Sequence, residues 1–139
     1  MKRIIILLAA GLFLWPAFSA TKLQASENQA IEAATAWLAL VDRGDYEKSW
    51  QETSTLFKKT VTIGQWTAAV KNARETLGDV VSRKLSSSEE HTSLPGVPDG
   101  SYIILFFDSS FEKKEKGLET VTTMLDTDGR WRVSGYFVH

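Results

Sequence analysis

The pattern of hydrophobic residues changes its period at Gly78, and this change limits the folds that the chain can adopt. Before Gly78, apolar residues recur every three or four positions, which is typical of amphipathic helices. After it, β-branched and aromatic residues alternate with polar ones or run together, which is typical of strands. Consecutive helices followed by consecutive strands predict an α+β fold with an antiparallel sheet and argue against an alternating βαβ arrangement.

Three helices are predicted in the first half of the chain. The first begins at a capping box whose N-cap is Ser26, and it ends at Gly44. A second, shorter helix is capped by Asp45, and a third runs from a capping box at Thr62 to Gly78. Each helix carries a tryptophan on its apolar face, and we expect all three to be buried: Trp37, Trp50 and Trp66.

Four strands are predicted after Gly78, at 79–92, 102–107, 120–126 and 130–138. The second is apolar at every position, which indicates a strand covered on each side or paired within a curved sheet. Asp128-Gly129 predicts a two-residue hairpin, and Gly135 predicts a bulge or bend that lets the sheet curl over the helices. We therefore expect three helices packed on a curved four-stranded antiparallel sheet, with the tryptophans against Ile104, Phe106 and Val133.

The first twenty residues have the pattern of an export signal. Two cations precede an apolar run over 4–18, and small residues at Ala17 and Ser19 place a cleavage site between Ser19 and Ala20. The alternative is an uncleaved membrane anchor, but a spanning helix needs about 20 apolar residues, and this run is shorter and contains Pro16. We predict a periplasmic or secreted protein without a membrane span after cleavage. Its parts are a signal peptide at 1–19, a short lead-in at 20–29 and a single domain at 30–139.

The composition argues against several functional classes. The chain of 139 residues has no cysteine, which excludes a disulfide scaffold, a thiol nucleophile and a zinc ribbon. Without the first twenty residues the net charge falls from −1 to −3, and an acidic surface is unlike that of a dedicated nucleic-acid binder. The two histidines, His91 and His139, lack the spacing and the third ligand of a catalytic metal site. No metal and no cofactor is predicted.

Several short motifs occur together in a fixed order along the chain. They are Gly44-Asp45-Tyr46, Ser49-Trp50, Trp66 with Arg74, Leu77-Gly78, Ser93-Leu94-Pro95-Gly96, Pro98-Asp99-Gly100-x-Tyr102 and Gly129-Arg130-Trp131-Arg132-Val133-x-Gly135-Tyr136-Phe137. Together they resemble the bacterial exported family called "domain of unknown function 4019", from about Ala30 to His139. The resemblance implies a signal peptide and one compact domain, and it supplies no established activity. The order of elements is also similar in architecture to the cystatin-like and nuclear-transport-factor-like folds.

The second resemblance implies a cone-shaped pocket, in which enzymes of this shape use a carboxylate beside a phenol. An apolar pocket raises the pKa of an aspartate, and a tyrosine hydroxyl can stabilise an enolate. Asp108, at the end of the apolar strand, is the candidate catalytic carboxylate, and Tyr102 is the candidate donor, with Tyr46 and Tyr136 as alternatives. The other interpretation of Asp108 is an ordinary turn residue.

Trp131 lies between two arginines in the last predicted strand. On a strand, Arg130 and Arg132 share one face while the indole points to the other. With Arg83 they predict a basic stripe on the exposed side of the sheet, suited to an anionic partner such as an envelope polysaccharide or phospholipid headgroups. The alternative is a solvated face whose cations pair with Glu119 or Asp126.

These observations favour a non-enzymatic binding or interaction module of the cell envelope, with Arg130, Trp131 and Arg132 as candidate binding residues. One alternative is a small-ligand pocket protein that uses Asp108 and a tyrosine as an enzyme would. A third hypothesis is a homodimer formed through the sheet face. The sequence names neither the envelope partner nor the small ligand.

Overall fold

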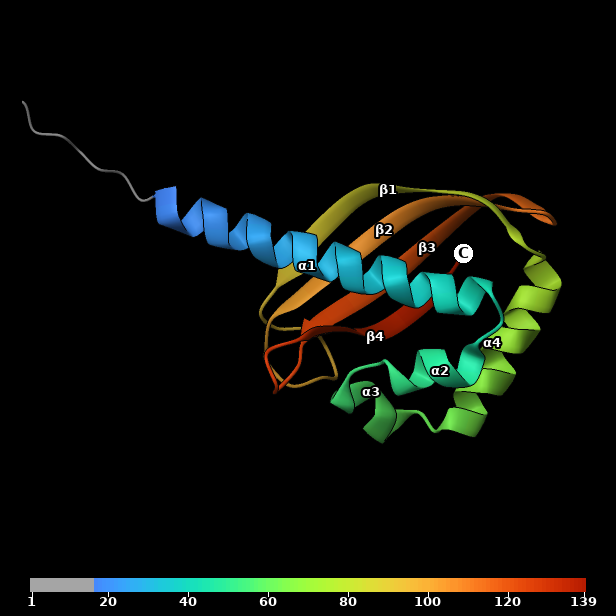
Figure 1. The fold of residues 1–139 in the computed structure, drawn as a ribbon, viewed down its shortest axis with the longest axis horizontal. Coiled ribbons are helices and arrows are strands. Elements are labelled where there is room, and N and C mark those ends of the chain that lie inside the picture. Colours follow the sequence, from blue (N-terminus) through green and yellow to red (C-terminus); the bar gives the residue numbers. More distant parts are fainter. Residues whose placement is uncertain (1–16) are drawn as a thin grey trace, which may run out of the picture.

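The computed structural model describes residues 17–139, so most of the predicted signal peptide, residues 1–16, lies outside the described residues. Four helices precede four strands (Figure 1). The strands form one antiparallel sheet in the order β1-β2-β3-β4. The bounds are α1 Ala17–Asp42, α2 Tyr46–Gln51, α3 Thr55–Thr60, α4 Ile63–Leu77, β1 Val80–His91, β2 Tyr102–Phe111, β3 Lys114–Leu125 and β4 Trp131–Val138. The predicted α+β fold is confirmed, and the described part has one helix more than predicted, α3.

The first helix does not begin at the predicted capping box. α1 already includes Ala17 and continues through Ser26 without a break. Its early turns are stabilised within the helix, because the Gln24 amide bonds to Glu27 and Asn28 one turn later, at 3.4 and 3.2 Å. These turns extend beyond the sheet (Figure 1). Within residues 17–139, no helix is both long and apolar enough to cross a membrane.

The other helix ends follow local sequence signals in most cases. Thr62 and Gln65 form the predicted capping box of α4, with N–H···O distances of 3.2 and 3.0 Å. Gly44 and Gly78 adopt the positive φ angles, +81° and +75°, that end α1 and α4. Asp45 occupies the N-cap position of α2, as predicted, but its side chain makes no capping bond and instead pairs with Arg43 at 3.0 Å.

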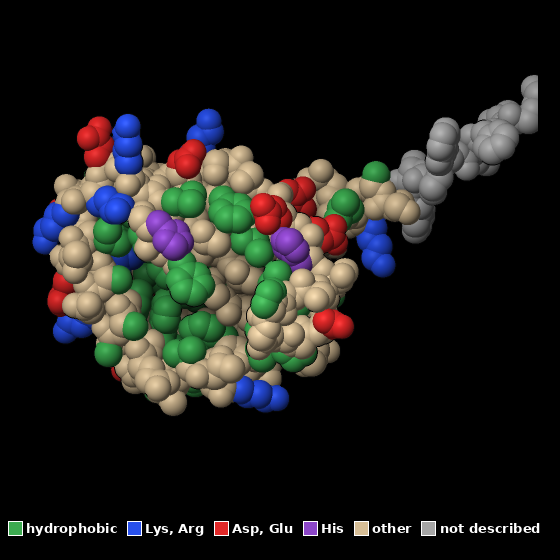
Figure 2. Space-filling model, turned by 180° about the vertical axis from the view of Figure 1, so that it is seen from behind, with side chains coloured by type: hydrophobic (Ala, Val, Ile, Leu, Met, Phe, Trp, Pro, Cys, Tyr) green, Lys and Arg blue, Asp and Glu red, His purple; other side chains and the backbone are tan. Residues whose placement is uncertain are grey.

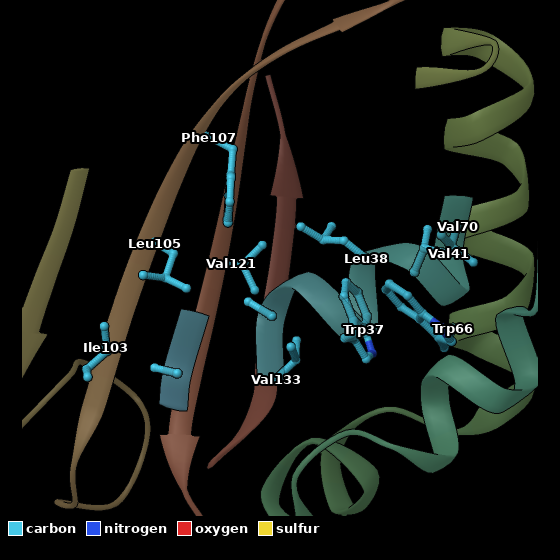
Figure 3. Packing of buried hydrophobic residues seen from close by; sticks show 12 residues of the cluster. Trp37, Leu38, Val41, Trp66, Val70, Ile103, Leu105, Phe107, Val121 and Val133 are labelled. Atoms are coloured by element: carbon cyan, nitrogen blue, oxygen red, sulfur yellow. The ribbon is translucent and has the colours of Figure 1, made fainter. Parts of the chain in front are cut away.

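The sheet presents the opposite face of β2 to the helices from the one we predicted. Ile104 and Phe106 are only half-buried, while their neighbours on the other face are buried: Ile103, Leu105 and Phe107. A strand that is apolar at every position gives no alternation from which to choose the face, and a shift by one residue exchanges all its side chains. The inward residues belong to the hydrophobic core, which also includes buried residues of α1 and α4 (Figure 3).

Two of the three predicted tryptophans belong to this core. The rings of Trp37 and Trp66 lie 5.5 Å apart and both are buried, as predicted, beside Val133. Trp50 is half-buried at the edge of the core, where its indole N–H donates to the carbonyl of Val61 at 2.8 Å. The aromatic side chains therefore join α1, α4 and the segment between α2 and α4.

β4 carries the bulge that Gly135 predicted. Thr122 pairs with Gly135 and Thr123 with Val133, so Ser134 is an extra residue on this edge strand. The bulge connects β4 to α3, because the Ser54 hydroxyl donates to Ser134 at 2.9 Å and the Ser54 N–H donates to the Val133 carbonyl at 2.8 Å.

The turn before β4 is longer than the predicted two-residue hairpin. The backbone N–H of Asp126 donates to the carbonyl of Arg130 at 2.8 Å, and the N–H of Gly129 donates to the carbonyl of Asp126 at 2.9 Å. Only Gly129 has a positive φ angle, +80°, as in three-residue hairpin loops that combine a turn with a left-handed glycine. This loop positions the candidate binding residues described next.

Candidate functional site

The candidate catalytic pair is not brought together. Asp108 and Tyr102 lie six positions apart on β2, a separation of about 20 Å along a strand. Asp108 is exposed at a shallow depression of about 370 Å³ that also includes Lys116. Tyr102 is buried, and its hydroxyl donates to the carbonyl of Pro98 at 2.6 Å. The geometry gives Asp108 neither an enclosed apolar pocket nor a phenol partner.

Four charged side chains instead meet inside the fold, in a cluster that we call the ionic core. Each comes from a different element: Asp42 from α1, Arg74 from α4, Arg83 from β1 and Glu119 from β3. Arg83 reaches both carboxylates, with its closest nitrogen–oxygen distance 2.7 Å in each case. Arg74 lies 2.9 Å from Asp42 and 3.5 Å from Glu119.

Two hydroxyl groups complete the ionic core. Glu119 is fully buried and also accepts hydrogen bonds from Ser109 of β2 and Tyr136 of β4. The Tyr136 oxygen in turn accepts from Arg74 at 3.1 Å. The cluster thus joins α1, α4 and all four strands, and a buried carboxylate with this many donors satisfies its hydrogen-bonding capacity.

The electrostatics favour the charged forms of Arg83 and Glu119 and the neutral form of Tyr136. Burial alone would lower the pKa of Arg83, but hydrogen bonds to Asp42 and Glu119 raise it above the ordinary value. Burial alone would raise the pKa of Glu119, but hydrogen bonds from Arg83, Ser109 and Tyr136 lower it. Burial and the nearby Glu119 charge raise the pKa of Tyr136, which therefore stays a neutral donor. Two cations balance two anions, so the ionic core offers no surplus charge to a ligand.

A groove along the C-terminal half of α1 contains all three candidate binding residues. This α1–β4 groove has a volume of about 440 Å³ and lies between α1, the residues around α2 and the start of β4. Its apolar side is formed chiefly by Ala33, Ala36, Trp37, Leu40 and Trp131. Its charged side chains are Arg43, Lys48, Arg130 and Arg132, with Glu52 as the single acid.

The structure gives the two arginines of this groove different roles. Arg132 forms a bidentate pair with Asp128, both distances being 2.7 Å, and also lies 3.2 Å from Asp126. Its hydrogen bonds lower the pKa of the Asp128 carboxyl. Arg130 is exposed and forms no ion pair in the described part of the chain. Arg132 therefore holds the hairpin loop, whereas Arg130 is available to a ligand.

The predicted basic stripe is divided between different sites. Arg83 points into the ionic core and pairs with Glu119, and Arg132 pairs with Asp126, which are the two partners named for the alternative interpretation. No local pattern indicates that Asp42 and Arg74 join Arg83, because they lie 41 and 9 positions from it and on different elements. The one sequence feature that could have indicated the ionic core is an acid, Glu119, at an inward position of β3.

A wider depression of about 670 Å³ lies between α2 and α4. Two acids, Asp45 and Glu47, and two lysines, Lys48 and Lys71, line it, so its charge is balanced. Among residues 17–139, no three His, Asp or Glu side chains are placed to hold a metal ion. The α1–β4 groove is therefore the site where unbalanced charge and aromatic surface coincide.

Comparison with known proteins identifies the family. A family model described as "Protein of unknown function (DUF4019)" matches residues 33–136. The chain belongs to this family. The part that matches DUF4019 extends from the α1 wall of the groove to Tyr136 of the ionic core, so it includes both sites. No curated protein and no solved structure gives a significant match.

Proposed function

We propose that this protein is a non-enzymatic binding module of the cell envelope, and that the α1–β4 groove is its binding site. The observation that carries the proposal is the lining of the groove, where four cations surround an apolar floor and one of them, Arg130, has no ion pair in the described residues. The groove volume of about 440 Å³ lies within the range of roughly 300–1,000 Å³ that is usual for small-molecule sites. Such a site suits an anionic ligand with an apolar surface.

Retention on an immobilised polyanion, dextran sulfate, tests this site. Arg130→Glu should elute at lower salt than the wild type, because it reverses the charge of the one groove cation without an ion pair in the described residues. Lys114→Glu is the matched control, since Lys114 is an exposed cation at the distant β2–β3 hairpin. Equal shifts for the two variants would mean that the groove is not the anion-binding site.

The envelope location is the second part of the proposal, and it rests on the N-terminal pattern of two cations, an apolar run and small residues. We expect the full-length chain to be exported and cut between Ser19 and Ala20. Cell fractionation with mass spectrometry of the intact protein measures both. A cytoplasmic protein that retains residues 1–19 would refute export.

A homodimer through the sheet is a second candidate, favoured by an apolar row on the face away from α1. Phe106, Thr120 and Phe137 are direct neighbours across β2, β3 and β4, and Phe137 is 64% exposed. Hydrophobic side chains gather on the rear of the molecule, where Figure 2 also shows a hollow. Light scattering after size exclusion should give twice the monomer mass, and Phe137→Glu should restore the monomer. A wild-type monomer at high concentration would contradict this candidate.

A further inference from the structure

We infer that the ligand of the α1–β4 groove is an acidic sugar, namely a short oligosaccharide whose rings carry carboxylate groups. The inference rests on the proposed function and adds the chemical class of the ligand. Three features of the groove support it. The indole N–H of Trp131 has no hydrogen-bond partner in the described residues, and Arg130 has no ion pair there. The groove also lacks the surfaces that a membrane lipid or an extended peptide would need.

Trp131 differs from the other described tryptophans in its hydrogen bonding. The indole N–H groups of Trp37, Trp50 and Trp66 each donate to a protein oxygen at 2.8–2.9 Å. The indole N–H of Trp131 has no partner among residues 17–139, although the side chain is partly buried against the core. A pyranose offers both things that this side chain lacks, an apolar C–H face for the ring and hydroxyl oxygens for the N–H.

Arg130, the residue before Trp131 in the chain, supplies the complementary charge in the lining of the same groove. A guanidinium binds a carboxylate through two parallel hydrogen bonds, and Arg130 has no competing ion pair in the described chain. Arg43 and Lys48 are engaged only in exposed pairs, with Asp45 at 3.0 Å and Glu52 at 3.4 Å. Exposed pairs of this kind are weak, so both cations can turn towards a second carboxylate.

The shape of the groove suits more than one sugar ring. Ala33, Ala36 and Leu40 follow one another on the same stripe of α1, and the two alanines leave space above the helix. From Ala33 to Leu40 the helix rises about 10 Å, which gives the groove the form of a slot. A short oligosaccharide can lie along the slot with one ring on Trp131.

A membrane lipid fits these observations less well. Anchoring to a lipid surface uses exposed apolar side chains that enter the acyl region. The large hydrophobic residues that are exposed within the described chain all lie outside the groove lining: Leu23, Ile63, Val81, Leu125 and Phe137. The groove therefore has a site for an anionic group and none for inserting into a bilayer.

An extended peptide also fits poorly. A peptide that adds to the edge of β4 needs free backbone groups on that strand. At the groove the Val133 carbonyl already accepts from the Ser54 N–H at 2.8 Å, and Ser134 beside it is bonded to Ser54. α3 thus covers the edge where a peptide strand would pair.

Titration calorimetry with defined sugars tests the inference on the purified exported protein. The probes are the trisaccharides of galacturonate, glucuronate and mannuronate, each compared with its uncharged methyl ester. We expect one acidic trisaccharide to bind and its ester to bind at least about tenfold more weakly, the loss typical of a charged hydrogen bond. Phosphatidylglycerol vesicles and adenosine monophosphate are the competing probes.

Two variants assign the binding to the groove. Arg130→Ala should weaken the acidic trisaccharide about tenfold and leave the weak binding of the ester unchanged. Trp131→Phe keeps a flat ring against the core and removes the N–H, so it should weaken both sugars about threefold to tenfold. Lys114→Ala is the control and should change neither.

The outcomes separate this inference from the proposed function. If vesicles or the nucleotide bind in an Arg130-dependent manner and none of the trisaccharides does, the groove is a binding site and the sugar assignment is wrong. If no probe binds, and Arg130→Glu and Lys114→Glu elute from dextran sulfate at the same salt concentration, both proposals fail. If an acidic trisaccharide binds Arg130→Ala as tightly as the wild type, the assignment of the sugar to this groove is wrong.

Discussion

The inner face of the sheet has two regions of opposite chemistry within a few residues of each other. On β3, Val121 belongs to the hydrophobic core, and Glu119, two positions earlier on the same face, is the centre of the ionic core. Both are fully buried. Apolar burial stabilises without regard to direction. A buried charge requires specific partners at hydrogen-bonding distance, so the ionic core restricts how α1, α4 and the strands fit together.

Removing Glu119 should produce the largest difference in stability loss between the ionic core and the hydrophobic core. Glu119→Ala leaves Arg83 and Arg74 without this buried partner, and we expect a loss of about 3–5 kcal/mol in the free energy of unfolding. Val121→Ala on the same face removes two methyl groups and should cost about 2 kcal/mol. Chemical denaturation measures both values. Equal losses would show that the ionic core is no more sensitive to the loss of one side chain than the hydrophobic core.

Acid should weaken the ionic region before the apolar one. The folded-state pKa of Glu119 is lowered, so its contribution is present above the unfolded-state pKa of about 4.3 and is lost as the pH falls through the folded-state value. Denaturation at a series of pH values should therefore show falling stability below about pH 4.3. Glu119→Gln should flatten this dependence, leaving the part due to Asp126 and Asp128, whose pKa values are lowered too. An unchanged slope in the variant would remove Glu119 as its source.

Tyr136 belongs to both regions and separates their contributions within one side chain. Its ring lies 5.3 Å from that of Trp37, while its hydroxyl donates to Glu119 and accepts from Arg74. Tyr136→Phe keeps the ring and should cost about 1–3 kcal/mol for the lost bonds to charged groups.

Tyr136→Phe should also change how the stability depends on pH in alkaline solution. Because the folded-state pKa of Tyr136 is raised, its contribution is present below the unfolded-state value of about 10 and is lost as the pH rises above it. Tyr136→Phe should therefore lose less stability than the wild type between pH 9 and 11 (about the pKa of a free phenol). A steeper alkaline loss in the variant would contradict the role of the hydroxyl.

The smallest effect should come from a site outside both regions. Thr62→Ala removes the side-chain cap of α4 and should cost about 1 kcal/mol. This value provides a reference for a purely local change in the helix that carries Arg74. If Thr62→Ala cost as much as Glu119→Ala, the position of α4 would depend on its cap rather than on the ionic core.

Features that depend on neighbouring residues could be predicted from the sequence. Gly44, Gly78 and the Thr62 capping box end or begin helices because the required bonds form within a few positions. The start at Ser26 failed because residues before it also favour a helix. The inward face of β2 could not be chosen, since 102–107 offers apolar side chains on both faces.

The candidate site also has features that could be predicted from local sequence and features that could not. The adjacent Arg130, Trp131 and Arg132 indicated a binding surface, and the structure places all three in one groove. Their separate roles could not be read from the sequence, because they depend on the path of the hairpin loop to Asp128. The ion pairs of the ionic core join residues 32 to 45 positions apart, which no local pattern reveals.

The division of labour between the two groove arginines has an evolutionary consequence. Arg132 keeps the loop in place through Asp126 and Asp128, while the side chain of Arg130 contributes no ion pair to the described fold. Substitutions at position 130 are therefore tolerated by the framework and act directly on the charge of the groove. Under the proposed function, relatives that keep the Arg132 pairs with Asp126 and Asp128 can differ in ligand preference through this one position.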